Sequence, residues 1–505
     1  MMAMLHLDQL PEELLIHILD YLDTKAPSEQ KIRQEPSLSL TCSDQNTLKS
    51  VSLVSRRWRR LVLPSLFRYA RLRLDLPPQA QWAQCAACSQ SALTFGQATA
   101  QSKSGVDSYH AEMVAAAHNA HQLSLRHGQS DEEAQQMGEA AFTERQRLHP
   151  AAVLAWVPRF YHGLKDFLVF LATNELDHHV RSFVLYTARM LHQKLDRYPH
   201  TAADRDWRYH ASAAFWNHLS CVVELERIVI VAPPSDLACL TNCTIDTIAD
   251  WAFGDMDYHV LELRQHGMPS EQRSAETRSN AMIPYSQLRP LPTTLPGVAD
   301  SSILHLRPWT HVALNEGSFL KAYGTYEYFE RGPPSIVESI KVCLNWLPIG
   351  PPQGLPGSKG THSLCALRKF SYTAIFPFAN HIEVGTLLQV VEELEAQFAP
   401  DPQSGILDDR ARTGKAELED CWQELVTAYF HLVQLVGTRA ITRTTAPRLK
   451  KLICRDYAIA ALQEDLDEIF TGLCLPVWAE YEPGVFTRLQ MEATIPGSGS
   501  RSTFG

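Results

Sequence analysis

The sequence predicts a mixed α+β or α/β protein, with a short helical block at the N-terminus and then an irregular array of strands and helices. Two observations predict it. Residues 10–22 and 48–62 each place their apolar side chains on one side of a helix. From Tyr69 onward, short runs of the form apolar-x-x-apolar-x-apolar recur, separated by segments with helical spacing. That alternation is typical of parallel strands joined by crossover helices.

The first helical segment carries more apolar surface than one packing contact requires. Five of its side chains span an arc of roughly 140° at 100° per residue, namely Leu14, Leu15, Ile18, Leu19 and Leu22. Leu10 and Ile16 widen the arc further. A helix that packs against one neighbour needs only about 100°. Residues 10–22 are therefore expected to bury two faces, one against their own domain and one against a partner.

The second segment separates apolar from basic side chains. If residues 48–62 are helical, the apolar side chains gather within about 100° and the basic ones lie opposite. The apolar set is Val51, Val54, Trp58, Leu61 and Val62, and the basic set is Arg56, Arg57, Arg59 and Arg60. We interpret the basic set as the solvated side of this helix.

Two separated blocks match one family in order and residue type. They are the opening Leu10-Pro11-Glu12 with the ladder Leu14, Ile18 and Leu22, and the later run Leu53-Val54-Ser55-Arg56-Arg57-Trp58. These blocks resemble the F-box, a three-helix motif that docks onto a Skp-family adaptor in cullin-RING ubiquitin ligases. The resemblance covers residues 5–68. It implies that a Skp-family adaptor, and through it a cullin scaffold, is bound through Leu10, Pro11, Leu14, Ile18, Leu22, Val54 and Trp58.

One tract departs from the family pattern. Asp23–Thr47 stands where F-boxes usually have a short turn, and it contains Pro27 and Pro36 but few large apolar residues. Lengthening an exposed loop costs little closure entropy. We therefore interpret residues 23–47 as a loop insertion, and we predict that deleting Lys25–Asp44 leaves adaptor affinity within a few fold.

The strand-like runs resemble the strand consensus of leucine-rich repeats. Six of them lie between residues 150 and 490, and they begin at Val180, Leu225, Tyr258, Trp309, Leu367 and Leu449, with Tyr69 starting a seventh. Successive starts differ by 45, 33, 51, 58 and 82 residues, whereas a regular repeat has about 20–29. Two interpretations stay open for residues 150–490: a degenerate, leucine-rich-repeat-like substrate-binding domain, or an unrelated α/β domain.

In the repeat interpretation the six runs form one parallel sheet, and a client protein contacts its outward-pointing side chains. The candidate client contacts are Glu226, Arg227, Glu262, His311 and Arg368. Helices are expected between the strands at Ala211–Val222, Glu338–Trp346, Gly385–Phe398 and Ala416–Val436. Residues 79–147 are expected to be a low-order helical or disordered insertion, and residues 495–505 a disordered tail.

Composition argues against several classes of function. Lys and Arg number 46 against 56 Asp and Glu, a formal charge of −10, which does not suit a nucleic-acid surface. No apolar run approaches the ~18 residues of a membrane span. The 11 cysteines, without an export signal, indicate a reducing cytoplasmic or nuclear location. Cys85 and Cys88 have no second ligand pair at zinc spacing, so we expect neither a metal nor a cofactor.

The common nucleotide-binding, hydrolase and metalloprotease motifs are absent from the sequence, so we expect a non-catalytic protein. The leading hypothesis is a substrate-recognition adaptor of an SCF-type ubiquitin ligase. The adaptor binds a Skp-family protein through the F-box and an unidentified client through the C-terminal domain. The alternative is a scaffold or trafficking protein that keeps the Skp-family contact without a role in ubiquitin ligation.

Overall fold

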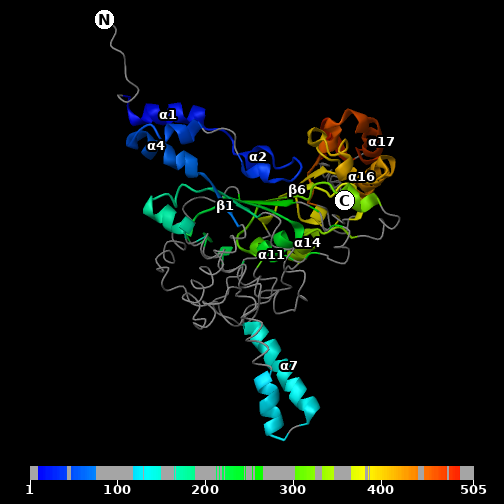
Figure 1. Ribbon diagram of the computed structural model, residues 1–505. Helices are drawn as coiled ribbons and strands as arrows, with labels where there is room; N and C mark the ends of the chain where they lie inside the picture. The colour runs from blue at the N-terminus through cyan, green and yellow to red at the C-terminus, as the bar shows by residue number, and fades with distance from the viewer. Residues whose placement is uncertain are drawn as a thin grey trace, which may run out of the picture.

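The computed structural model describes residues 10–42, 47–74, 118–148, 164–187, 212–265, 302–345, 366–441, 448–474 and 477–489, with short gaps inside several of these ranges. Figure 1 shows a helical N-terminal block beside a broad sheet, with helices below the sheet and at its C-terminal end. Among the described residues, no helix combines the length and the apolar character that crossing a bilayer requires.

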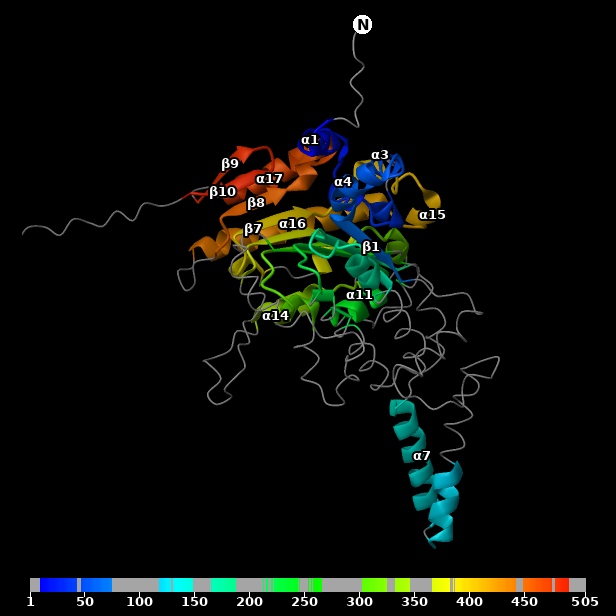
Figure 2. The same cartoon turned by 90° about the vertical axis from the view of Figure 1, so that its left-hand side faces the viewer.

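The N-terminal block is a bundle of three helices, as the sequence predicts. They are α1 (Glu12–Leu22), α3 (Thr47–Val51) and α4 (Arg56–Phe67). Ser55 caps α4, since its side chain accepts a hydrogen bond from the Trp58 N–H. The bundle has its own small core, made of Leu15, Leu19, Leu48, Trp58 and Val62. It lies beside β1 at the N-terminal edge of the sheet (Figure 2).

All seven predicted runs are strands of one ten-stranded sheet, whose order is β1-β2-β3-β4-β5-β6-β7-β8-β10-β9. The strands are β1 (Tyr69–Arg73), β2 (Ser182–Tyr186), β3 (Arg227–Ala232), β4 (His259–Arg264), β5 (His311–Asn315), β6 (Lys369–Thr373), β7 (Glu393–Gln397), β8 (Lys451–Cys454), β9 (Trp478–Glu482) and β10 (Val485–Arg488). Neighbours in the sheet therefore follow chain order up to β8, and the hairpin of β9 and β10 forms the last two strands at that edge.

The expectation of a purely parallel sheet is wrong. Strand β4 pairs antiparallel with both β3 and β5, and β10 pairs antiparallel with β8 and β9. The remaining neighbours are parallel. Alternation of apolar residues decides which face of the sheet a side chain points to, and it is the same for a strand of either direction. The sequence pattern therefore could not predict the reversal of β4, and the sheet is mixed.

A second correction concerns Gly385–Phe398, which the sequence predicts to be a helix. The structure has a short 3₁₀ turn, η11 (Leu387–Gln389), followed by strand β7. Leu394, Ala396 and Phe398 are buried and alternate with the polar residues Glu393, Glu395 and Gln397. Because the apolar residues of this stretch also fit helical spacing, the local pattern was ambiguous.

The described helices outside the bundle are α2 (Pro27–Gln30), α7 (Asp131–Leu148), α11 (Pro234–Thr241), α14 (Val337–Asn345), α15 (Arg410–Thr413), α16 (Leu418–Ile441) and α17 (Gln463–Cys474). Short 3₁₀ turns include η2 (Leu38–Thr41), η6 (Ile303–His305), η7 (Leu320–Gly324), η10 (Phe378–His381), η12 (Pro402–Ser404), η13 (Arg455–Ala458) and η14 (Ala460–Leu462). Helices α14 and α16 confirm two of the predicted helices. Residues 118–126 of the predicted low-order insertion are helical, and most of α7 also lies within this insertion. Cys85, Cys88 and residues 495–505 lie outside the described residues.

One face of the sheet supplies the main hydrophobic core. In-register neighbours such as Phe183 and Ile228, or Val312 and Phe370, all point to this face. Buried residues of α11, α14, α16 and α17 complete the same core, among them Leu237, Ile340, Tyr429 and Phe470. Burial of these side chains holds the strands in one layer.

The opposite face is covered in part by the insertion of the helical bundle, which the sequence analysis placed in an exposed loop. We call residues 27–41 the strap; it contains α2 and η2. Its residues Ile32 and Leu40 are buried against a patch of four valines, Val184, Val229, Val231 and Val260. Figure 1 shows α2 on the side of the sheet opposite α11 and α14. The strap is therefore a second layer on the sheet, and its assignment to an exposed loop is wrong.

Polar contacts fix the strap along its length. Asn315 Nδ2 donates to the carbonyl oxygens of Ile32 and Gln34, both at 2.8 Å. Further along, Glu35 accepts hydrogen bonds from the N–H and the hydroxyl of Ser318. Gly317 has a positive φ of 69°, and a Cβ there would lie 2.7 Å from Pro36 Cδ. The strap and the loop after β5 therefore approach as closely as a glycine allows.

Candidate functional site

The seven residues predicted to contact a Skp-family adaptor occupy different environments. Trp58 is buried in the core of the bundle, so its assignment as a surface contact is wrong. Leu10 and Leu22 are half-buried against that core. Four others are exposed: Pro11, Leu14, Ile18 and Val54. An apolar position on an amphipathic helix can belong to its own core or to a partner, and the pattern does not separate the two.

Three further apolar side chains of the bundle are exposed and were not among the predicted contacts: Ile16, Tyr21 and Leu53. On α1, Leu14, Ile18 and Tyr21 recur at the i, i+4, i+7 spacing of one helix face. Leu53 and Val54 lie in the turn between α3 and α4 and are 79% and 66% exposed. We call Leu14, Ile18, Tyr21, Leu53 and Val54 the docking residues. Exposed apolar side chains along one helix face, such as Leu14, Ile18 and Tyr21 on α1, are typical of a binding surface.

Ion pairs hold α1 against α4. Glu12 at the start of α1 pairs with Arg57 and Arg60 of α4. Arg57 also donates a hydrogen bond of 2.7 Å to the carbonyl oxygen of Leu10. Part of the basic cluster therefore serves the bundle itself, and the chain entering α1 is held beside α4.

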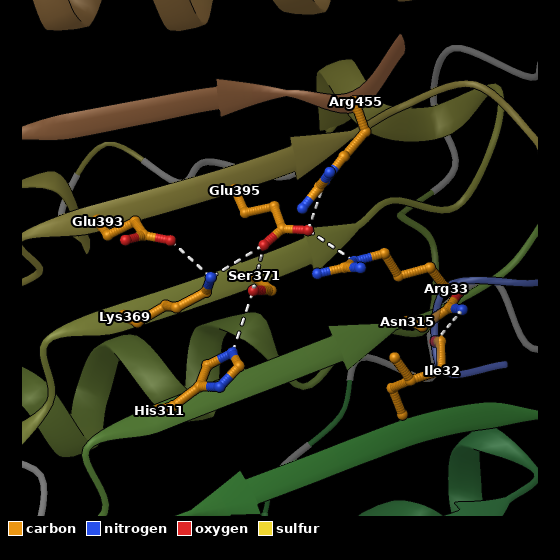
Figure 3. A network of polar contacts seen from close by, with 9 residues as sticks. All are labelled: Ile32, Arg33, His311, Asn315, Lys369, Ser371, Glu393, Glu395 and Arg455. Atoms are coloured by element: carbon orange, nitrogen blue, oxygen red, sulfur yellow. Dashed lines mark hydrogen bonds and ion pairs between the residues drawn. The ribbon is translucent and has the colours of Figure 1, made fainter. Parts of the chain in front are cut away.

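A second surface is a groove of about 910 Å³ on the polar face of β4 to β7. It reaches the two ends of β8 at Arg448 and Arg455 and is bounded on one side by the strap. Figure 3 shows its centre, the Glu395 carboxylate, which lies among three cations. Arg33 Nε lies 2.6 Å and Arg455 Nε 2.7 Å from the same carboxylate oxygen, and Lys369 Nζ lies 3.1 Å from the other. Burial alone would raise the pKa of Glu395. The hydrogen bond from Arg455 and the charges of Arg33 and Lys369 outweigh it and lower the pKa to about 2. The groove floor therefore stays ionised.

His311 lies in the same groove and is uncharged at neutral pH. Burial, with Lys369 and Arg264 nearby, lowers its pKa to about 4. Its Nε2 lies 3.1 Å from the hydroxyl of Ser371, and that hydroxyl lies 3.3 Å from Glu395. The acid therefore contacts the serine, whereas in a nucleophilic triad the acid contacts and orients the histidine. The geometry suits a hydrogen-bonding surface.

The five predicted client contacts lie in three different environments. Arg227 and Glu262 are 5% and 1% exposed, so the expectation that they point freely outward is wrong. Arg227 donates to Glu262, to the hydroxyl of Ser182 and to both oxygens of Ser28 in the strap. His311 and Arg368 line the groove. Glu226 is exposed and lies 3.6 Å from Arg181, outside the groove.

A buried acid at the end of β5 allows a pH test of the fold. Glu316 is fully buried, and burial raises its pKa to about 7 although Tyr372 donates a hydrogen bond to it. One of its oxygens and Nδ1 of His259, which lie 3.8 Å apart, have no hydrogen-bond partner among the described residues. The folded protein therefore holds a proton here that the unfolded chain releases near pH 4.5.

We predict that Glu316→Gln makes stability less dependent on pH. Because the folded-state pKa is raised, Glu316 costs no stability below about pH 4.5 and its full cost above pH 7. Glutamine mimics the protonated acid. The free energy of unfolding of the variant relative to wild type should therefore rise by roughly 3 kcal/mol from pH 5 to pH 8, measured by urea denaturation. An unchanged difference across this range would contradict the raised pKa.

Comparison with known families gives one result. The F-box-like family model matches residues 7–73, which include α1, the strap, α3, α4 and all of β1. Residues 7–73 therefore form an F-box-like domain, which supports the resemblance to F-box proteins. No curated protein matches the chain. No solved structure matches it either. A leucine-rich-repeat-like array in the sheet domain is not confirmed by any of these comparisons.

Proposed function

We propose that this chain is the substrate-recognition adaptor of an SCF-type ubiquitin ligase. The observation that carries the proposal is the set of docking residues, exposed on a domain of the F-box-like family. F-boxes use such a surface to bind a Skp-family adaptor, which in turn joins a cullin scaffold. The sheet domain then holds the client. Its contribution to catalysis is proximity, because a bound client lysine meets the conjugating enzyme at high effective concentration.

A charge substitution on the docking residues tests the first step. The double variant Leu14→Glu/Ile18→Glu should lose binding to a purified Skp-family protein, because apolar anchors at interface centres often contribute at least ~2 kcal/mol each. Both side chains are exposed, at 50% and 37%, so the fold should tolerate the change. Isothermal titration calorimetry gives the affinity, and circular dichroism checks the fold.

The matched control is Val342→Glu. Val342 lies on α14 and is 53% exposed, and the substitution introduces one negative charge, of the same kind as each of the two in the docking variant, on an exposed apolar position of the sheet domain. It should leave the affinity unchanged. Equal affinities for wild type and Leu14→Glu/Ile18→Glu, with both folded, would rule out this docking surface.

The second candidate function is a Skp-family-bound scaffold or trafficking protein outside ubiquitin ligation. Purification of the full chain from cells distinguishes the two. Recovery of a cullin together with the Skp-family protein supports the ligase adaptor, and recovery of the Skp-family protein alone supports the scaffold. A cytoplasmic or nuclear location belongs to both proposals, since the described cysteines, Cys42, Cys243, Cys343, Cys421 and Cys454, are free thiols.

A further inference from the structure

We propose that the groove on β4 to β7 binds an extended, acidic segment of the client, and that the strap of the F-box-like domain forms one wall of this binding site. The ligand chemistry is a peptide with carboxylate or phosphate side chains. The inference rests on the proposed function, because it names what the substrate-recognition domain would recognise.

The charge of the groove differs in sign from that of the whole chain. Its lining includes six cations, Arg33, Arg264, Arg368, Lys369, Arg448 and Arg455, and four anions, Glu29, Glu262, Glu392 and Glu395. The difference is 6 − 4 = +2 with histidine neutral, whereas the chain carries −10. A concave surface with low-dielectric walls concentrates the field of its charges. The groove therefore attracts anions to a protein that otherwise repels them.

Most of the exposed charges of the groove are positive, although Glu29 and Glu392 are half-buried rather than at the floor. Glu262 and Glu395 lie at the floor, with side chains only 1% and 3% exposed. Arg368 and Arg448 are exposed at the rim. Arg33 and Arg455 bind Glu395 through Nε, and each guanidinium carries two further nitrogens in a fork that suits carboxylate and phosphate oxygens.

The dimensions suit an extended peptide. Neighbouring strands lie about 4.8 Å apart, so the four strands that contribute lining residues, β4 to β7, span roughly 14 Å, the length of about four extended residues. Small side chains in the middle of the face, Ala313, Ser371 and Thr373, leave room between the long charged ones. The volume of about 910 Å³ lies within the range of ligand-binding clefts.

The strap belongs to the site. Glu29, Ile32 and Arg33 line the groove, and the bonds from Asn315 to the strap backbone hold Ile32 and its neighbours in place (Figure 3). Since the strap joins α1 to α3, the same insertion connects the adaptor-binding helices to the client groove. A peptide in the groove is therefore held at a fixed place relative to the docking residues.

Fluorescence anisotropy of the full chain, in complex with a Skp-family protein where one binds, tests this site. The probes are fluorescein-labelled ten-residue peptides: one of alternating Glu and Ser, the same peptide with phosphoserine, and one of alternating Lys and Ser. We expect binding of the anionic peptides only, weakening between 50 and 300 mM NaCl. Preference for the phosphoserine probe, or competition by inorganic phosphate, identifies phosphate as the recognised group, and binding of the Glu probe alone identifies carboxylate.

The variant Arg368→Glu/Arg448→Glu should weaken binding of the anionic probe at least ten-fold, because it reverses two rim charges. The control Arg410→Glu changes an exposed arginine of α15 outside the groove and should stay within three-fold of wild type. Absence of anionic binding, or equal losses in both variants, would overturn the groove assignment. Loss of Skp-family binding in the docking variant is measured separately. Failure of the proposed function and failure of this inference are therefore distinguishable.

Discussion

Replacing both Ile32 and Leu40 by alanine should destabilise the entire sheet domain by about 4 kcal/mol or more. The two side chains are 8% and 1% exposed, and both pack on the valine patch of β2 to β4. Truncating a buried leucine or isoleucine to alanine typically costs 2–5 kcal/mol, because contacts are lost and a cavity remains. Natural domains have only about 5–15 kcal/mol of stability. A substitution within the F-box-like domain is therefore expected to unfold strands far away in the sequence.

Urea denaturation followed by tryptophan fluorescence measures this effect. The matched control is Leu53→Ala, a leucine truncation in the same domain at a position that is 79% exposed. It should change stability by less than about 0.5 kcal/mol. If Ile32→Ala/Leu40→Ala unfolds at the same urea concentration as the control, the strap does not pack on the sheet in solution.

This packing changes how a deletion of Lys25–Asp44 has to be tested. The sequence predicts that the deletion leaves adaptor affinity nearly unchanged, and that prediction stands for the docking residues themselves. The deletion also removes Ser28 and the buried apolar residues of the strap, which uncovers Arg227 and the valine patch. Loss of adaptor binding in the deletion variant is therefore informative only if the sheet domain stays folded.

Much of the fold could be predicted from the alternation of apolar residues. The alternation placed Phe183, Ile228 and Phe370 on the core face of one sheet, and the structure confirms these strands and their order, except that the unpredicted strand β7 lies between β6 and β8. Strand direction could not be predicted, because an alternating run such as that of β4 is the same in either direction. The packing of the strap on the sheet could not be predicted from the sequence either. Between Ile32 and Leu40 only Leu38 is a further large aliphatic residue, so the tract has too few apolar positions to establish a helical or strand period.

The candidate sites were predictable only in part, for a related reason. The wide apolar arc of α1 correctly indicated more than one apolar face. The apolar pattern of residues 48–62 could not separate Trp58 in the core from Val54 at the surface. Arg227 and Glu262 occupy alternate, polar positions of strands, which are usually solvated when one layer of helices covers a sheet. A second layer from a distant part of the chain buries them, and no local pattern reports such a contact.

Replacing Arg227 by methionine should destabilise the protein by roughly 3–5 kcal/mol, because it removes one partner of a buried ion pair. Burial alone would raise the pKa of Glu262, but the charges of Arg227 and Arg264 outweigh it and lower the pKa. Without Arg227, the Glu262 carboxylate keeps only Arg264, at 2.8 Å, and Ser28 and Ser182 lose a donor. Thermal and urea denaturation measure the loss.

The double variant Arg227→Met/Glu262→Gln separates a structural role from a role in client binding. Glutamine removes the unpaired charge and still accepts a hydrogen bond from Arg264, so the double variant should recover part of the stability lost in Arg227→Met. Recovery would mean that the stability lost in Arg227→Met is the free-energy cost of burying the Glu262 carboxylate without its main partner. A single variant that is as stable as wild type but fails to bind the acidic probe would instead support the sequence-based assignment of Arg227 as a client contact. Such a result requires the strap to leave this end of the sheet when a client binds. The two outcomes therefore decide whether the strap is a permanent second layer of the fold or a cover over part of the recognition surface.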